Sequence, residues 1–428
     1  MSVGLLLKAK VKKGLLSRFG SKEEDSKRTL EKMEKWVLEH NADVCHRSFI
    51  GSRDDKPTLY LTLHPAAEDV EITILGPDTF TASANTSTVG PGYHIFVCDI
   101  LHKLGKQFHA TWHEPDDDYC DETGFFHSGD QQHVFAEMAA WLKGVAKMFF
   151  DGTLSDSVHS VRLALPLDTG FESDGRATTP TGPRNVEWLK KTAENADNGR
   201  DFFAWWTPGL NAEYFLGRAK ASMWTDVRWR TPINDSERET LKYVAESLRK
   251  AHSLDPTLNY PWAEWKETLG FLGSQNREWD FVMQHPESDT PAIGYRRRNV
   301  TVQLPGRWWI TLPGSFSNFL PAENDALCAQ DPPRAIWYSG YRFADNAPQA
   351  FEHWRTETLK MKKDILREED GFIAEAQIAP QTENGHEYFA LTSSNVCSSG
   401  RCICTIIFLK PEDREWAINV WKSLEPPK

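Results

Sequence analysis

The chain is 428 residues long, which favours two to four domains over one. Its 49 Lys and Arg residues are outnumbered by 61 Asp and Glu residues, so the formal net charge is −12, the wrong sign for a protein that coats nucleic acid. The mean hydropathy is −0.53, and no run of about 18 residues is both apolar and uncharged, so stable membrane insertion through a spanning helix is excluded.

The first 22 residues concentrate positive charge. They contain six Lys and Arg residues and no acidic residue, and the apolar run Leu5–Leu7 is shorter than the roughly 7–15 apolar residues of a secretory signal. We therefore expect a basic N-terminal arm over residues 1–22, which is either a frayed or packed terminus or is available to a membrane surface or an acidic partner. Seven scattered cysteines, an odd number, do not suggest a disulfide framework and favour a cytoplasmic setting.

Residues 23–165 have the pattern of an α/β domain. Apolar residues at 30, 33, 37 and 38 follow helical spacing, and alternation over 59–63 and 70–74 predicts two strands in an antiparallel hairpin. Gly90-Pro91-Gly92 opens a predicted helix that runs to residue 104. A strand near 108–112, an amphipathic helix over 135–145 and a strand over 161–165 complete the predicted domain.

Residues 166–184 are rich in Gly, Pro, Ser and Thr and are predicted to be a linker. The region 185–285 then predicts a helical domain. Asn234 or Asp235 is the expected start of its long third helix, and Asp255-Pro256 ends that helix in a way that resembles the junction between tetratricopeptide-type units. With one such junction we expect a small bundle, with helices at 185–196, 209–224, 235–253 and 261–272.

The region 290–428 predicts antiparallel strands closed by a helix from Pro411. Strands 300–304 and 309–312 flank Pro305-Gly306, and the remaining expected elements are strands at 335–338, 341–343, 371–379, 386–393 and 401–408 and a helix near 347–365. This order, with the phrase WWITLPGSF at 308–316, resembles the PsbP- and DcrB-like α+β sandwich, a mostly non-enzymatic family, which implies a binding scaffold. The predicted fold class is α+β: an N-terminal α/β domain, a helical middle domain and a C-terminal antiparallel sheet with a terminal helix.

Residues 114–122 hold six carboxylates and no basic residue. The spacing of Asp116, Asp118 and Glu122 suits Ca²⁺ only in part, because an EF-hand loop counted from Asp116 has Asp121 where Gly is required and lacks the bidentate Glu at its end. The segment is then either a solvated loop or a contact surface for a basic partner. We predict no metal site and, on the second interpretation, partner contacts from Glu114, Asp116, Asp117, Asp118, Asp121 and Glu122.

Other residue clusters could carry chemistry but match no complete signature. His109 and His113 lie on a predicted strand, where they would be roughly 13 Å apart, too far for one zinc ion. Asp168-Thr169-Gly170 resembles an aspartic-protease motif without the second Asp that such catalysis needs. Cys402 and Cys404 share one face of an apolar strand, as core thiols do. We therefore predict no catalytic residue and no cofactor.

Aromatic residues crowd the window 202–265. Such rings bury large areas, so most of them should form the core, but exposed Trp residues are also typical anchors of protein interfaces. On that second interpretation Trp205 and Trp206 are candidate partner contacts, from a domain other than the one that carries the acidic loop.

These features together favour a non-enzymatic binding protein. In acidity, size and lack of a catalytic signature the chain resembles the large cytosolic immunity proteins of bacteria. That resemblance implies a protein partner, a secreted toxin domain such as an ADP-ribosyltransferase or a nuclease, neutralised by occlusion of its active site. Two alternatives stay open: a metal-dependent enzyme using the His- and Asp-rich segment 109–133, and a scaffold protein of a larger assembly.

Overall fold

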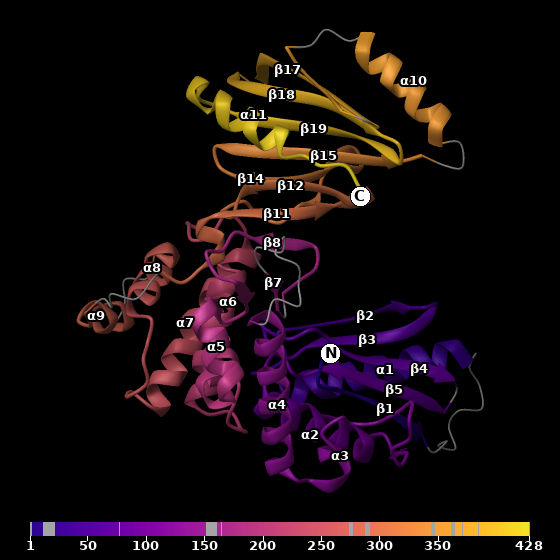
Figure 1. Ribbon diagram of the computed structural model, residues 1–428, viewed down its shortest axis with the longest axis vertical. Helices are drawn as coiled ribbons and strands as arrows, with labels where there is room; N and C mark the ends of the chain where they lie inside the picture. The colour runs from indigo at the N-terminus through magenta and orange to yellow at the C-terminus, as the bar shows by residue number, and fades with distance from the viewer. Residues whose placement is uncertain are drawn as a thin grey trace. The chain divides into compact units, whose positions relative to one another are not determined.

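The structure is a computed structural model (Figure 1). It describes residues 2–11, 22–76, 78–150, 161–163, 165–273, 277–286, 292–343, 347–360, 364–369, 371–383 and 385–427. The chain divides into two compact units, each with its own helices and sheets. The first unit comprises residues 1–165, 173–227 and 231–294, and the second comprises residues 166–172, 228–230 and 295–428. The mixed α+β class is as predicted.

A six-stranded antiparallel sheet forms the base of the first unit, in the order β2-β3-β4-β5-β1-β6. β3 and β4 pair antiparallel, which confirms the predicted hairpin. β2 and β5 were not predicted from the sequence. The strands are β1 (Gly4–Val11), β2 (Arg47–Arg53), β3 (Lys56–Thr62), β4 (Val70–Gly76), β5 (Thr79–Asn85) and β6 (Ala110–Trp112).

β1 corrects the prediction of a free basic arm over residues 1–22. The strand pairs with β5 on one side and β6 on the other. Leu5, Leu7 and Ala9 are buried, whereas the alternate residues, among them Lys8 and Lys10, face the other side of the sheet. The lysines therefore belong to the polar side of a strand. The rest of the predicted arm, residues 12–21, lies outside the described residues.

Two helices pack on the side of the sheet that carries Leu5, Leu7 and Ala9, which we call the helix face. α1 (Lys22–His40) contacts β2, β3 and β4, and it buries Leu30, Met33 and Val37 as predicted. α2 (Pro91–Gln107) contacts β6. Each buried large apolar side chain stabilises the fold by about 1.5–3 kcal/mol.

The opposite side of the sheet, which we call the polar face, carries the alternate residues. The strand register places Leu6 opposite Ser83, and Ser83 opposite Glu71. A side chain two residues away along any of these strands shares the same side. Gly4, Asn85 and Arg53 therefore also belong to the polar face.

The segment predicted as a linker, residues 166–184, is structured. β8 (Thr169–Phe171) pairs with a strand of the second unit, and β9 (Ala177–Thr179) and β10 (Gly182–Arg184) form a buried antiparallel hairpin. β7 (Val161–Arg162) pairs parallel with β9 at the position predicted for the strand 161–165. Gly, Thr and Pro here form tight strand pairs and turns.

The helices of residues 185–285 are close to those predicted, and three begin at an asparagine. The side chains of Asn185, Asn211 and Asn234 accept a hydrogen bond from the backbone N–H three residues later, which stabilises each helix start by about 1 kcal/mol. The helices of the first unit beyond α2 are α3 (Phe125–Ser128), α4 (Gln131–Phe150), α5 (Val186–Glu194), α6 (Ala212–Thr225), α7 (Asp235–Leu254), α8 (Trp262–Leu272) and α9 (Arg277–Met283).

The middle region is not a separate domain, contrary to the prediction, because its aromatic residues pack on α2. Trp205 lies 5.1 Å from Phe96 and 6.1 Å from Tyr93, measured between ring centroids. Gly90, just before α2, has a φ of 120°, and an added Cβ would come within 2.7 Å of the Trp205 carbonyl oxygen. The predicted Gly90-Pro91-Gly92 helix start is therefore also a close contact with the middle region.

The second unit contains a seven-stranded antiparallel sheet in the order β13-β14-β15-β19-β18-β17-β16 and a three-stranded sheet, β12-β11-β8. The hairpin around Pro305-Gly306 and the terminal helix are as predicted. The elements are β11 (Asn299–Leu304), β12 (Trp308–Pro313), β13 (Leu320–Pro321), β14 (Leu327–Asp331), β15 (Arg334–Arg342), α10 (Ala347–Lys360), β16 (Ile365–Glu369), β17 (Phe372–Glu383), β18 (His386–Cys397), β19 (Gly400–Phe408) and α11 (Arg414–Lys422).

The core of the second unit combines both sheets with α11. Trp308, Ile310 and Leu312 of β12 and Trp421 of α11 are buried in one apolar cluster. The two strands predicted at 335–338 and 341–343 are one strand, β15 as far as residue 342, because Ser339-Gly340 between them pairs continuously with β19. The predicted boundary at residue 290 also misses residues 166–172 and 228–230, which belong to this unit.

None of the helices in the described part of the chain is both long and apolar enough to cross a membrane.

Candidate functional site: an acidic concavity and its buried anchor

The acidic segment 114–122 is a loop that runs alongside β1. Backbone hydrogen bonds connect His113 N–H to the Lys8 carbonyl at 3.0 Å, Leu6 N–H to the Cys120 carbonyl at 2.9 Å, and Glu122 N–H to the Gly4 carbonyl at 3.2 Å. Within the loop, the Asp116 carboxylate accepts the N–H groups of Asp118 and Tyr119 at 3.0 and 2.8 Å. The backbone of this segment, predicted to be either a solvated loop or a contact surface, is therefore held to β1 along its length.

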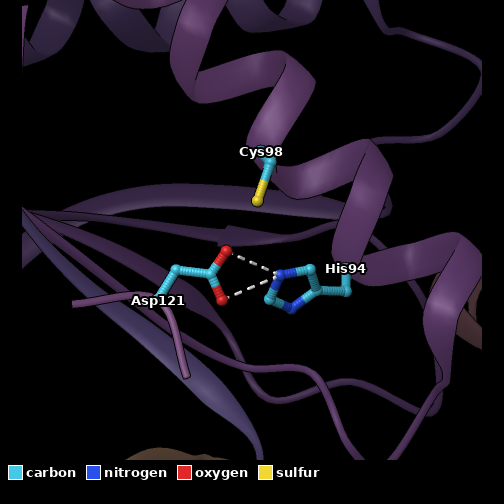
Figure 2. Close-up of side chains that lie close together, drawn as sticks. All are labelled: His94, Cys98 and Asp121. Atoms are coloured by element: carbon cyan, nitrogen blue, oxygen red, sulfur yellow. Dashed lines mark hydrogen bonds and ion pairs between the residues drawn. The ribbon is translucent and has the colours of Figure 1, made fainter. Parts of the chain in front are cut away.

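The structure separates the six acidic residues of this loop into two groups. Glu114, Asp116, Asp117, Asp118 and Glu122 are exposed, as a contact surface requires. Asp121 is buried, and its side chain is 1% exposed. The prediction of Asp121 as a partner contact is therefore wrong: Asp121 bridges to Leu5 of β1, and its side chain points inward toward His94 of α2 (Figure 2).

Asp121 is the acceptor of a buried hydrogen-bond network. Its carboxylate lies 3.1 Å from His94 Nε2 and accepts the N–H groups of Thr123 and Phe126 at 2.8 Å each. Burial raises the pKa of Asp121, but the bonds from His94 and from these N–H groups outweigh it, so the net pKa is lowered. The charged carboxylate thus holds α2, the acidic loop and the start of α3 together.

The hydrogen bonds place a proton on Nε2 of His94. The Thr123 hydroxyl donates to Asp121 at 2.9 Å, so it accepts from His94 Nε2, also at 2.9 Å. The other ring nitrogen, Nδ1, lies 2.8 Å from the Thr86 hydroxyl. Hydroxyl, imidazole and carboxylate thus stand in the order of a catalytic triad. Thr86 and His94 are 0% exposed, however, so no substrate can reach the hydroxyl in this structure.

Cys98 completes the one group of metal-ligand type found within the described ranges. Its Sγ and the nearest His94 and Asp121 ligand atoms lie within 4.8 Å of one another (Figure 2). Burial and the neighbouring carboxylates Asp121 and Asp99 raise the pKa of the Cys98 thiol well above its usual value, which disfavours the thiolate that binds metals. Both nitrogens of His94 already have protein partners, so an ion would have to displace hydrogen bonds.

Of the segment 109–133, named as a possible enzyme site, Asp121 belongs to the group with His94 and Cys98, whereas the segment's histidines lie outside it. His109, His113, His127 and His133 are exposed. In the portion of the chain that the structure describes, which includes all of 109–133, none of them belongs to a group of three potential metal ligands close enough for one ion.

The exposed side of the acidic loop borders a concavity of about 410 Å³ on the polar face of the sheet. Five of its lining side chains are carboxylates and one, Arg53, is a cation. Arg53 pairs with Glu71, and Arg47, nearby, pairs with Asp69 at 3.4 Å. The five carboxylates are Glu68, Asp69, Glu71, Asp118 and Glu122.

Three of these carboxylates remain uncompensated. Within the described ranges, Glu68, Asp118 and Glu122 make no ion pair, although Glu122 accepts the Gly4 N–H at 2.6 Å. We call the concavity lined by these five carboxylates the acidic concavity. Unpaired like charges in one hollow repel one another, and a cation that enters it would relieve that repulsion.

The two predicted tryptophan contacts differ. Trp205 is 0% exposed and donates its indole N–H to the carbonyls of Thr207 and Gly209, so its prediction as a partner contact is wrong. Trp206 is half-buried and lies 5.2 Å from Phe135, with the Arg200 guanidinium 5.1 Å from its ring centroid. Trp206 remains a candidate anchor, and it belongs to the same compact unit as the acidic loop.

Sequence reasoning missed Glu68, Asp69 and Glu71 as members of the site. Glu71 could have been found, because it alternates with Val70 and Ile72 and therefore lies on the polar side of β4. His94 was missed because one histidine in an amphipathic helix gives no signal. Its partner Asp121 lies 27 residues away in sequence.

Comparisons with known proteins give little further information. No family model matches the chain, and no curated protein matches it. Part of the chain is similar to a crystal structure from Bacteroides thetaiotaomicron VPI-5482, at 15% identity with a TM-score of 0.25. The match covers 30% of this chain and 48% of that chain. A likeness at this level carries no argument about fold or function.

Proposed function

We propose that the chain is a non-enzymatic binding protein that holds a basic protein partner at the acidic concavity. The observation that carries this proposal is the set of three unpaired carboxylates, Glu68, Asp118 and Glu122, in one hollow beside an exposed acidic loop. A Lys or Arg side chain of a partner would enter the hollow and neutralise them. Complementary charge of this kind speeds association and rejects acidic competitors.

The backbone around the concavity supports binding without large rearrangement. The loop is fixed to β1 by backbone hydrogen bonds, and Asp121 anchors it to α2. A pre-formed surface loses less conformational entropy when a partner binds. Charge alone gives modest affinity, because exposed ion pairs contribute about 0–1 kcal/mol each, so tight binding also needs a desolvated anchor.

The particular function proposed within this class is immunity: neutralisation of a secreted toxin domain, such as a nuclease or an ADP-ribosyltransferase, in the cytoplasm. A nuclease that holds a polyanion presents a basic cleft, and an acidic surface would occupy that cleft in place of the substrate. The proposal of immunity in particular is supported by the acidity of the chain and of the concavity.

The test compares two variants with equal changes in net charge. The concavity variant carries Glu68→Gln, Asp118→Asn and Glu122→Gln. The control variant carries Glu31→Gln, Glu39→Gln and Glu194→Gln, all exposed residues of α1 and α5 that lie outside the concavity. Both sets replace carboxylates by amides of the same shape, so acceptors such as that for Gly4 N–H are kept.

Parent and variants are used as affinity baits in lysates of the native host, and bound proteins are identified by mass spectrometry. The proposal predicts a basic protein captured by parent and control but lost from the concavity variant. If that protein is a toxin, co-expression with the parent should restore growth, and co-expression with the concavity variant should not. Equal capture by all three baits would contradict the proposed surface.

A further inference from the structure

A second pocket of the first unit lies where the loop between α1 and β2 meets α6 and α7. It encloses about 590 Å³ and is lined by residues of the 42–46 loop, by Arg218 of α6, and by Tyr243, Glu246, Arg249, Lys250 and Ser253 of α7. It shares no lining residue with the acidic concavity. The proposed function makes no use of it.

The main feature of this pocket is the buried cation Arg218, which is 7% exposed. Its Nε donates to the Ser247 hydroxyl at 2.8 Å, and its Nη1 donates to the Asp43 carbonyl at 2.5 Å and the Tyr214 hydroxyl at 3.3 Å. All three acceptors are neutral. Throughout the described residues, no carboxylate lies within ion-pair distance of this guanidinium, and its Nη2 makes no hydrogen bond.

Aromatic rings compensate the buried charge only in part. The guanidinium carbon lies 4.4 Å from the ring centroid of Tyr243, 4.9 Å from that of Phe215 and 5.4 Å from that of Tyr214. Cation–π contacts are individually weak compared with the cost of burying an unpaired ion. A negatively charged group that reached Nη2 would therefore gain a strong, charge-assisted hydrogen bond.

The charges around the pocket favour an anion with a single negative charge. Lys250 is paired with Asp43 at 3.4 Å, and Arg249 with Glu278 at 3.6 Å. Among the described lining residues, Arg218 is the cation that makes no ion pair, and the exposed Glu246 adds a carboxylate at the rim. A further carboxylate, Asp226, acts electrostatically on the lining residues His46 and Tyr243. A phosphate dianion would exceed the one available positive charge and would be repelled by Glu246. A carboxylate matches both the charge and the planar guanidinium.

We propose that this pocket binds a small organic monocarboxylate, with its carboxylate on Arg218 Nη2 and its organic part against the ring of Tyr243. The volume exceeds that of a carboxylate alone, so an attached ring or chain of a few carbons fits. His46, whose ring centroid lies 5.0 Å from that of Tyr243, lines the same pocket.

The test measures binding of benzoate, acetate and inorganic phosphate to the full chain by titration calorimetry and NMR. We expect benzoate to bind about ten-fold more tightly than acetate, since its ring adds apolar contact, and phosphate to bind more weakly than either. A peptide that contains one Glu and has blocked ends should bind at least ten-fold more weakly than benzoate. Absence of benzoate binding, tighter phosphate binding, or tighter peptide binding would each overturn the proposal.

Four variants locate the site. Ala42→Trp places a bulky ring at the exposed rim without removing a polar contact, and it should abolish benzoate binding. Arg218→Lys keeps the charge but loses the planar fork, and it should weaken binding about ten-fold or more. Because Arg218→Lys can also disturb the fold, two exposed residues are changed as well. Lys250→Gln removes a positive charge from the pocket lining, and Glu246→Gln removes a negative one. Lys250→Gln should weaken binding and Glu246→Gln should strengthen it, each by about two- to three-fold. If Ala42→Trp binds like the parent, the site is wrong.

Discussion

At the scale of single residues, one carboxylate of the acidic loop differs in role from its neighbours. Asp121 accepts hydrogen bonds from His94, Thr123 and Phe126, so its removal leaves several buried donors without an acceptor. Asp121→Ala should lower the free energy of unfolding by about 3–5 kcal/mol. The exposed Asp117→Ala should change it by less than about 0.5 kcal/mol. Urea denaturation measures both, and a loss below about 1 kcal/mol for Asp121→Ala would contradict the anchoring role.

His64 makes stability depend on pH. It is fully buried, with its Nδ1 accepting the Ala66 N–H at 3.0 Å, and burial lowers its pKa to about 3. Below its ordinary pKa of about 6.5, the unfolded chain takes up a proton that the folded protein cannot bind until about pH 3. Proton uptake by His64 in the unfolded chain therefore lowers the free energy of unfolding as pH falls, by up to about 1.4 kcal/mol per pH unit.

The corresponding variant is His64→Asn, which keeps an acceptor near the Nδ1 position. It should be less stable than the parent at pH 7 because it is smaller, but its free energy of unfolding should fall less steeply between about pH 6.5 and pH 5. Denaturation curves at several pH values give the two slopes. Equal slopes would show that His64 is protonated, or accessible to protons, in the folded protein.

At the scale of elements, β1 shows how a strand with one buried apolar side and lysines on the other side can be mistaken for a basic arm. Leu7 is 3% exposed and Leu6 is 40% exposed, although they are adjacent. Leu7→Ala should therefore cost about 2–5 kcal/mol, and Leu6→Ala well under about 1 kcal/mol. Equal, small effects of both substitutions in thermal or chemical unfolding would show that residues 4–11 are a free arm and not a packed strand.

Elements whose sequence pattern is local could be predicted, and elements that depend on pairing with a distant strand could not. The apolar spacing of Leu30, Met33 and Val37 and the cap at Asn234 are readable within a few residues of sequence. β1, by contrast, is defined by its pairing with the distant strand β5, in a register that joins Gly4 to Asn85 and Lys10 to Thr79. The site follows the same rule: exposure of the acidic loop was predictable, but the inward turn of Asp121 depends on His94 and the concavity on β4.

At the scale of the whole molecule, the second unit draws on residues from three separate stretches of sequence. Residues 228–230 contribute Arg230, which pairs with Asp331 of β14 at 3.2 Å and donates to the Ser315 carbonyl at 2.8 Å. Arg230 and Asp331 side chains are 15% and 20% exposed, so this pair is screened less than one at the surface. A domain boundary drawn by composition at residue 290 therefore cuts through the unit.

Arg230→Met tests this contribution. It should lower the local stability of β14 and β15 by about 1–3 kcal/mol, because Asp331 loses its ion pair, although it keeps the Ser315 hydroxyl, and the Ser315 carbonyl loses the Arg230 donor. The control Arg414→Met, which breaks an exposed pair with Glu415, should have almost no effect. Hydrogen exchange measured by mass spectrometry would show faster exchange in β14 and β15 for Arg230→Met alone. Unchanged exchange there would mean that residues 228–230 do not support the unit.

The measurement that tests the central claim most directly is the association rate constant with the captured partner, followed between about 0.02 and 0.5 M salt for parent, concavity variant and control variant. If the acidic concavity receives a basic partner, the parent and the control should associate rapidly at low salt and slow steeply as salt rises. The concavity variant should associate about ten-fold more slowly at low salt and with a flatter salt dependence. Identical rates and salt dependences for all three proteins would show that the partner binds elsewhere.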